Sequence, residues 1–317
     1  MSMSEAQQQR YLDRAIRALG THEVPDAVTK VRAIVGPRMI PVNEEAAQRA
    51  WTKIRDKQQP DPDELASLEM VIRLLRPAVF SRAGQLDDLP DQQGRNLYPP
   101  ELKDAWSSFR LKIQDLLYSI GRIDFIDGTH IGTGFLVRPG VLATNQHVLD
   151  DLTMGTGMLR KGVAEVRFQR EAGAVDGTEH VLPIDGVVAI HDFLDMALLS
   201  VPGAVDRPLV EVATGAVPEG MRVAAVGYPA KDNDRNPMFV GAIFGNTFGV
   251  KRAAIGEIRD GSRSPAVYHD CSTLGGNSGS PVFSLETGKA VAIHAAGKFM
   301  YRNDAIDGDH LSPFATA

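Results

Sequence analysis

The sequence predicts an α+β protein in which a small helical bundle precedes a larger part built of β-sheet. Residues 1–80 hold four segments whose apolar side chains recur at helical spacing, and three of these segments stop at glycine or proline. From residue 121 onward, Gly, Pro and Asp separate short alternating or fully apolar runs, which is typical of an antiparallel sandwich or barrel. We therefore expect a helical domain over residues 1–80, a linker and bracing helix over 81–120, and a β domain over 121–317.

The four helical stripes cover residues 11–19, 28–35, 47–54 and 65–75. Asn43 is a suitable N-cap for the third helix, and Glu44 and Glu45 in its first turn interact favourably with the helix dipole. An isolated helix must bury its apolar side somewhere, so we expect the stripes to form the core of a bundle. A partner-binding face is the alternative.

Residues 81–100 contain Gly, Pro and Asp in place of periodic apolar positions, and this composition predicts a linker. A fifth helix is expected to start at Pro99 and Pro100, because proline suits the first helical turn and well-spaced apolar residues follow it. The helix runs almost directly into the β domain, which we expect it to brace.

Composition and charge limit the classes of function. The chain has 317 residues, 43% of them hydrophobic, and a formal net charge of −6, without the basic stripe that nucleic-acid binding requires. Its polar N-terminus has no signal-peptide core, and no run approaches the ~18 apolar residues of a membrane span. A single cysteine, Cys271, cannot form an internal disulfide. We therefore predict a cytoplasmic protein that binds neither nucleic acid nor membrane.

The segment CSTLGGNSGSPVF, residues 271–283, surrounds Ser278 with glycines. Glycine reaches backbone angles that other residues avoid, so such a segment can turn sharply and leave N–H groups pointing outward. If Ser278 lies at the tip, its hydroxyl can attack a carbonyl while the N–H groups of Gly276 and Ser278 bind the developing oxyanion. The alternative is a plain glycine-serine loop between two strands.

Two residues offer the partners that a nucleophilic serine needs. His147 ends the strand-like VLATNQH, and Asp195 opens the apolar run DMALLSV, where an unpaired carboxylate would be costly to bury. A histidine can accept the serine proton, and a carboxylate can orient that histidine. Taken alone, each is also consistent with an ordinary turn residue. The chain contains no H-E-x-x-H motif and no cysteine cluster, so we predict no metal and no cofactor.

The motifs TNQHV, D-x-A-L-L and GGNSGSP, together with GTGFLV and GYP, resemble those of chymotrypsin-fold serine endopeptidases, especially the bacterial trypsin-like and glutamyl endopeptidase branch. The resemblance covers roughly residues 119–305. It implies two six-stranded β-barrels with a cleft between them, His147 and Asp195 coming from the first barrel and Ser278 from the second. It also implies the roles of base, orienting acid and nucleophile for these residues.

The resemblance further implies a specificity pocket. Glutamyl endopeptidases have a histidine at the position of His294 and a hydroxyl residue at that of Thr273, and Gly297 would pair with an extended substrate. Ser272 stands where trypsin has the acid that selects Arg and Lys, although Asp270 is close. Cleavage after Glu or Asp is the first prediction and basic specificity the second; His294 as an ordinary core histidine stays open.

The chain departs from the family pattern in two places. Zymogens of the chymotrypsin type mature when a new N-terminal amine pairs with an acid just before the nucleophile, but Asn277 stands there. We hypothesise self-cleavage at Asp87, Asp88 or Asp91 in the acidic linker. The last residues, 301–317, look turn-rich rather than helical.

Together these observations predict an intracellular serine endopeptidase that acts on proteins or peptides and is regulated by its N-terminal helical domain, which can also bind a protein partner. The alternative is a non-catalytic, peptide-binding module with a protease fold. An intact set of His147, Asp195 and Ser278 with a glycine-built loop favours the enzyme, because a pure binder needs none of these together.

Overall fold

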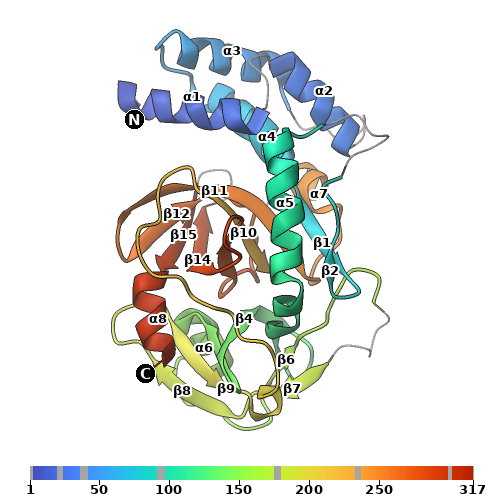
Figure 1. Cartoon of the computed structure of the whole chain (residues 1–317), viewed down its shortest axis with the longest axis vertical. Coiled ribbons are helices and arrows are strands. Elements are labelled where there is room, and N and C mark those ends of the chain that lie inside the picture. The colour runs from blue at the N-terminus through green and yellow to red at the C-terminus, as the bar shows by residue number, and fades with distance from the viewer. Residues whose placement is uncertain are drawn as a thin grey trace. The chain divides into compact units, whose positions relative to one another are not determined.

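The computed structural model describes residues 3–19, 24–35, 42–90, 97–174, 180–232, 237–298 and 302–316. The chain forms two compact units (Figure 1). The helical unit comprises Met1–Pro77, Asp88–Asp104 and Asn233–Asn246, and the β unit comprises Ala78–Asp87, Ala105–Asp232 and Thr247–Ala317.

The helical unit contains the four helices that the sequence predicts. They are α1 (Glu5–Leu19), α2 (Val24–Val35), α3 (Glu44–Arg55) and α4 (Pro62–Leu74). Asn43 caps α3, its side chain accepting a hydrogen bond of 3.0 Å from the Ala46 N–H. A buried ion pair joins α1 to α4, because the Arg14 guanidinium donates to both carboxylate oxygens of Glu69 at 2.7 and 2.6 Å. The apolar stripes therefore form a bundle core, as expected.

One further helix of this unit comes from a distant part of the chain. Helix α7 (Pro237–Phe244) packs against α4, although its residues lie between two strands of the β unit. Its apolar sequence PMFVGAIF has no polar face, which is why helical periodicity does not reveal it.

The larger sheet of the β unit contains a closed barrel. Its strand order is β10–β13–β14–β15–β12–β11–β1–β2, and β10 also pairs with β11, so the first six close on themselves. These six strands are β10 (Arg222–Gly227), β11 (Arg252–Arg263), β12 (Ala266–His269), β13 (Pro281–Ser284), β14 (Ala290–Lys298) and β15 (Arg302–Asp307).

The second sheet has seven strands in the order β7–β6–β3–β4–β5–β9–β8, and no pairing among the described residues closes it. Its strands are β3 (Ile120–Phe125), β4 (His130–Arg138), β5 (Val141–Thr144), β6 (Ala164–Arg167), β7 (Val181–Pro183), β8 (Gly186–Ile190) and β9 (Ala197–Ser200). The fold is thus the chymotrypsin-like double barrel, with the first barrel an open, curled sheet rather than the closed six-stranded barrel that was expected.

Residues 81–86 of the predicted linker, together with residues 78–80 of the predicted helical domain, form a β-hairpin instead. They form the strands β1 (Ala78–Arg82) and β2 (Gln85–Leu86), and β1 pairs with β11 in antiparallel register from Ala78 opposite Ala254. Glu171 secures this hairpin by accepting hydrogen bonds from the Ser81 hydroxyl and the Gly84 N–H, both at 2.8 Å. The composition misleads because the turn at Ala83 and Gly84 flanks a strand whose partner, β11, lies far along the chain.

The hairpin also bears on the hypothesis of self-cleavage. The Asp87 N–H donates to the Phe80 carbonyl at 2.9 Å, its carbonyl accepts from Trp106 Nε1 at 3.2 Å, and its carboxylate pairs with Arg82 at 2.8 Å. Because a protease binds its substrate in an extended form, Asp87 would have to leave all these bonds to be cut. Asp91 lies outside the described residues.

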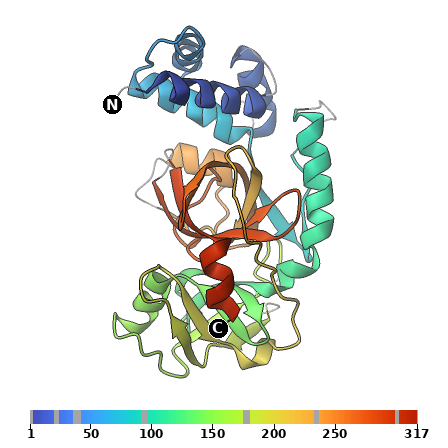
Figure 2. The ribbon, with the colours of Figure 1, turned by 60° about the vertical axis from the view of Figure 1, so that its left-hand side comes forward.

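Two helices pack on the β unit. Helix α5 (Pro100–Ile113) buries Trp106, Phe109 and Ile113, and the Phe109 ring meets Phe283 of β13 edge-on at 6.1 Å. Helix α8 (Gly308–Thr316) contacts β14 and β15 of the closed barrel and β4 of the open sheet (Figure 2). The expectation of a turn-rich C-terminal segment was therefore wrong.

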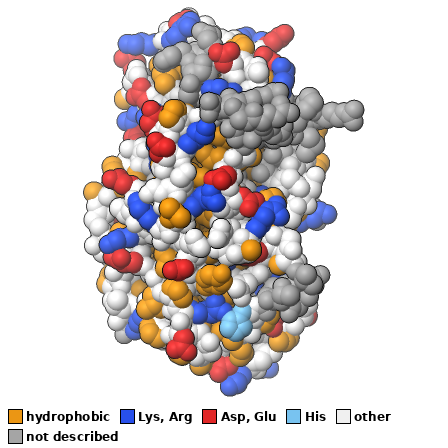
Figure 3. Space-filling view, turned by 45° about the vertical axis from the view of Figure 1, so that its right-hand side comes forward, with side chains coloured by type: hydrophobic (Ala, Val, Ile, Leu, Met, Phe, Trp, Pro, Cys, Tyr) orange, Lys and Arg blue, Asp and Glu red, His pale blue; other side chains and the backbone are white. Residues whose placement is uncertain are grey.

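Acidic and basic side chains are interspersed over the described part of the face shown in Figure 3, and no continuous stripe of one sign forms there. Among the described residues, no helix is both long and apolar enough to cross a membrane.

Candidate active site

Strand pairing brings His147 and Asp195 together. Strands β5 and β9 are antiparallel neighbours with Thr144 opposite Ala197, so the residues just after β5 lie beside those just before β9. His147 occupies the first turn of helix α6 (Gln146–Thr153), which follows β5. Its Nδ1 lies 2.7 Å from Asp195 Oδ2, and its backbone N–H donates to Asp195 Oδ1 at 2.9 Å. One carboxylate thus holds both the ring and the backbone of the histidine.

Asn145 fixes the other side of this contact, and the sequence analysis did not single it out. Its Nδ2 donates to the backbone carbonyl of Asp195 at 2.8 Å, and the side chain is fully buried. The bond ties the end of β5 to the start of β9, so Asp195 has little freedom to move away from His147.

The two pKa values move apart, as in a matched acid and base. The hydrogen bond to Asp195 raises the pKa of His147 above its usual value of 6.5. Burial opposes this increase, and the nearby charges of Asp150 and Asp151 add to it. Burial works to raise the pKa of Asp195, but its bonds to the His147 side chain and backbone outweigh burial and leave it below the usual value. With the carboxylate at Nδ1, the neutral ring keeps its proton there and leaves Nε2 as an acceptor.

The loop that carries Ser278 lies between β12 and β13 and depends on glycine. Gly276 and Gly279 have φ of +82° and +85°, a region that favours glycine. A Cβ on Gly279 would lie 2.0 Å from the Thr133 carbonyl oxygen, so no other residue fits there. Among the described residues, no acceptor binds the N–H of Gly276 or of Ser278. The loop therefore presents two backbone donors without internal partners.

Ser278 itself bonds to a neighbouring strand. Its Oγ donates to the Ala295 carbonyl of β14 at 3.3 Å, and no hydrogen bond joins it to His147 within the described residues. Its own carbonyl accepts the Thr133 N–H of β4 at 2.8 Å, which connects the serine loop to the sheet that carries His147 and Asp195.

The three residues predicted to line a specificity pocket lie on or beside β14. His294 is only 2% exposed, and its Nδ1 lies 3.1 Å from His269 Nε2. Burial, with smaller contributions from the charges of His269 and His147, holds the pKa of His294 well below its usual value. His269 itself is fully buried.

Thr273 and Gly297 meet at Asn303, which sequence reasoning missed. The Thr273 hydroxyl donates to Asn303 Oδ1 at 3.0 Å, and a Cβ on Gly297 would lie 2.4 Å from that same oxygen. Gly297 and Asn303 are register partners on β14 and β15, so only the strand pairing reveals the contact.

The residues near the expected base of the pocket differ in what they offer. Asp270 is 2% exposed, and its Oδ1 accepts the Glu257 N–H at 2.6 Å, so this oxygen is bonded to the backbone of β11. The Ser272 hydroxyl is buried and has no hydrogen-bond partner in the described part of the chain.

A double barrel with a bonded histidine and aspartate on one sheet and a glycine-built serine loop on the other defines a chymotrypsin-fold serine endopeptidase. Residues 132–293, just over half of the chain, match the family model described as "Trypsin-like peptidase domain". The chain belongs to this family of hydrolases, which act on proteins or peptides.

The chain is also similar to individual proteins. A Lysobacter enzymogenes protein named "Probable serine protease" is 29% identical over 296 residues, covering 78% of this chain and 74% of its own. The structure titled "serine endoprotease from Yersinia pestis" is similar with a TM-score of 0.48 and 16% identity, covering 65% of this chain and 64% of that one. The structure of Deg5 gives 0.48 and 20%, with 65% and 91% covered.

Proposed function

We propose that the endopeptidase works through a triad in which His147 is the general base, Asp195 orients it, and Ser278 is the nucleophile. The observation that carries the proposal is the pair of hydrogen bonds that the Asp195 carboxylate accepts from the ring and the backbone of His147, because the bond at Nδ1 fixes the tautomer that a base needs. Within the described residues the N–H groups of Gly276 and Ser278 have no acceptor, which supports their role as the oxyanion hole.

The chemistry follows from these positions. Rotation of Ser278 about χ1 releases its Oγ from the Ala295 carbonyl, and staggered rotamers exchange readily for a half-buried serine. Oγ attacks the scissile carbonyl carbon while its proton passes to His147 Nε2, and the carbonyl oxygen becomes an oxyanion facing the two N–H donors. The C–N bond then breaks as His147 returns the proton to the leaving amine. Water, activated by His147, hydrolyses the acyl ester and regenerates Ser278.

For specificity we propose cleavage after Glu or Asp, as in the glutamyl endopeptidase branch. The Cys271 N–H donates to His269 Nδ1 at 3.3 Å, so neutral His269 carries its proton on Nε2 and donates it to His294 Nδ1. His294 then keeps its own proton on Nε2, where it is available as a donor to a substrate carboxylate. A carboxylate arriving beside the ring would also favour the protonated form of His294. Basic specificity is less favoured because an Asp270 oxygen is already bonded to the Glu257 N–H.

A peptide library tests this specificity. We expect the full-length protein to produce new ends that follow Glu or Asp, with Ser278→Ala as background. His294→Gln removes the ionisable ring and should lower kcat/KM for a substrate with Glu before the cut by about 10–100-fold, the effect of losing a bond to a charged group. For a substrate with Gln before the cut, the same variant should change kcat/KM by less than about threefold. New ends after Lys or Arg in the mass spectra would contradict the acidic preference.

We further propose that the helical domain, residues 1–80, regulates the protease domain, residues 121–317, or binds a protein partner, and that the protein acts in the cytoplasm. The assignment of α7 to the helical unit supports a regulatory connection, because its segment enters and leaves through the β10–β11 loop of the β unit. To test for a partner, the proteolytic activity of the full chain is measured in the presence and absence of proteins pulled down on residues 1–80.

A further inference from the structure

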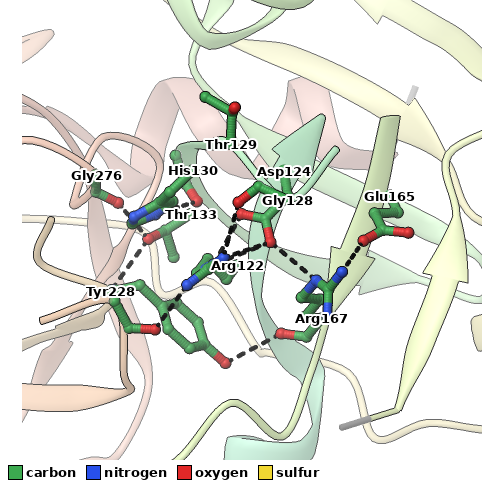
Figure 4. Close-up of polar contacts among 12 residues, drawn as sticks. Arg122, Asp124, Gly128, Thr129, His130, Thr133, Glu165, Arg167, Tyr228 and Gly276 are labelled. Carbon is green, nitrogen blue, oxygen red and sulfur yellow. Dashed lines mark hydrogen bonds and ion pairs between the residues drawn. The ribbon is translucent and has the colours of Figure 1, made fainter. Parts of the chain in front are cut away.

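Thr133 of the open sheet makes two hydrogen bonds to the serine loop and a third to Tyr228; Figure 4 shows those to Gly276 and Tyr228. The Thr133 hydroxyl donates to the Gly276 carbonyl at 2.7 Å and accepts the Tyr228 N–H at 3.2 Å. The Thr133 N–H donates to the Ser278 carbonyl at 2.8 Å. Two of these bonds fix carbonyl groups of the very residues whose N–H groups are proposed to bind the oxyanion.

These bonds matter because the loop is built of glycine. At φ +82° Gly276 has no Cβ to restrict it, so its flanking peptide groups can turn unless something outside the loop holds them. The N–H and carbonyl of one trans peptide point in opposite directions. The Gly275 carbonyl accepts the Ala230 N–H at 2.7 Å, which directs the N–H of Gly276, and Thr133 fixes the next peptide through the Gly276 carbonyl.

Neighbouring side chains stabilise the contact between Thr133 and the serine loop. The ring of His130 packs against Gly276, where a Cβ would lie 2.4 Å from its Cε1, and its Nε2 is 3.2 Å from the Gly132 carbonyl. Burial, with the charge of Arg122, lowers the pKa of His130 to about 3, so the ring is neutral near pH 7. Arg122 in turn donates to the Gly249 carbonyl at 3.1 Å and to Asp124 Oδ1 at 2.8 Å.

Asn277, and not an acid, stands just before Ser278, so the acid that pairs with a new N-terminus in chymotrypsin-type zymogens is missing from this position. Asn277 is 3% exposed, and its Nδ2 donates to the Leu274 carbonyl of its own loop at 3.3 Å. A neutral amide bonded in this way gives a freed amine no charge to neutralise. What sets the shape of this loop must therefore be sought among its contacts with other elements.

We propose that Thr133 is a positioning residue that holds the oxyanion loop in its donor-out form through the Gly276 carbonyl, so that the first barrel sets the oxyanion hole without N-terminal processing. The inference rests on the proposed triad and concerns the same site. Thr133 does not touch the reacting atoms; it acts by fixing the Gly276–Asn277 peptide, which lies between the two peptides that carry the N–H donors of Gly276 and Ser278.

The test compares Thr133→Val, which keeps the shape and removes the hydroxyl, with Thr133→Ser, which keeps the hydroxyl. The substrate is fluorescent casein, and the second readout is the rate at which a fluorophosphonate labels Ser278, because its phosphonyl oxygen enters the oxyanion hole. Thr133→Val should lower kcat and the labelling rate by about 10–100-fold, somewhat less than the loss of a whole donor. KM should stay within about threefold, and Thr133→Ser should restore both rates to within about threefold.

Thr153→Val is the matched control. The Thr153 hydroxyl also bridges two backbone groups, donating to the Leu149 carbonyl at 2.8 Å and accepting the Gly157 N–H at 3.2 Å, and Thr153, like Thr133, is buried. This variant should keep kcat within about threefold. If Thr133→Val does not fold, Thr133→Ala removes the hydroxyl without added bulk and takes its place, with the same expected result.

The outcomes separate the two proposals. If the native chain hydrolyses casein and is labelled at Ser278 while Thr133→Val keeps native kcat, the positioning role is overturned and the triad stands. Equal losses in Thr133→Val and Thr153→Val would also overturn it, because a general loss of packing would then explain the effect. If the native chain neither hydrolyses casein nor reacts at Ser278, the triad fails and the role of Thr133 fails with it.

Discussion

Replacing Ser278 with alanine is expected to lower kcat for casein hydrolysis by about 10⁶-fold, the scale measured for loss of the nucleophile in another serine protease. Without the hydroxyl no acyl-enzyme can form. Only the binding contacts and the N–H donors of Gly276 and Ser278 then contribute to catalysis. KM should change little, because Ser278 Oγ bonds to Ala295 and not to the substrate before attack. Steady-state kinetics with the purified full chain measures both parameters.

Ser280→Ala provides the control from the same loop. The Ser280 hydroxyl is fully buried and has no hydrogen-bond partner among the described residues, so its removal breaks no hydrogen bond with any of them. We expect near-native kcat for this variant. Residual activity of Ser278→Ala within tenfold of the native value would show that another group performs the chemistry.

The second large effect is expected from Asp195→Asn. The amide keeps the shape of the side chain but loses the charge that favours the protonated ring, and its NH₂ group can force the wrong tautomer on His147. We expect kcat to fall by about 10⁴-fold, the loss measured for the same change in another serine protease with a Ser-His-Asp triad. Asp192→Asn in the same exposed turn should leave kcat unchanged.

The pH dependence of activity provides an independent test of Asp195→Asn, because it predicts the direction in which the profile shifts. His147 must be neutral to accept the serine proton, so activity rises as pH increases through its pKa. Because Asp195 raises that pKa, the acid limb of the kcat/KM profile of the native protein should lie above pH 6.5. In Asp195→Asn the hydrogen-bonded charge is gone, so the acid limb should move to lower pH. A limb that stays in place would mean that His147 does not govern the rate.

The sequence predicted the catalytic candidates because each lies in a short local motif. His147 comes shortly after strand β5, and Asp195 comes shortly before strand β9. The antiparallel pairing of these two strands is enough to bring the two residues together. The glycines around Ser278 likewise predict a sharp turn. Asn145 lacked such a signal, because its role depends on the carbonyl of Asp195, which lies 50 residues away.

The parts that sequence reasoning missed depend on contacts between distant segments. Residues 78–86 look like a linker, and they become strands because β1 completes an edge of the sheet at β11. Asn303 and Thr133 have no motif of their own, and their contacts follow from strand register and from the approach of β4 to the serine loop. Helix α8 contains Pro313 and begins at a glycine, both of which argue locally against a helix, yet it packs across both sheets.

The most direct measurement of the central claim is covalent trapping of the nucleophile. The full chain is treated with a fluorophosphonate, digested, and mapped by mass spectrometry. We predict a single modified residue, Ser278, with labelling that depends on pH through the pKa of His147 and falls at least about 100-fold in His147→Ala. Modification of a different serine, or labelling of Ser278 at an unchanged rate without His147, would contradict the account.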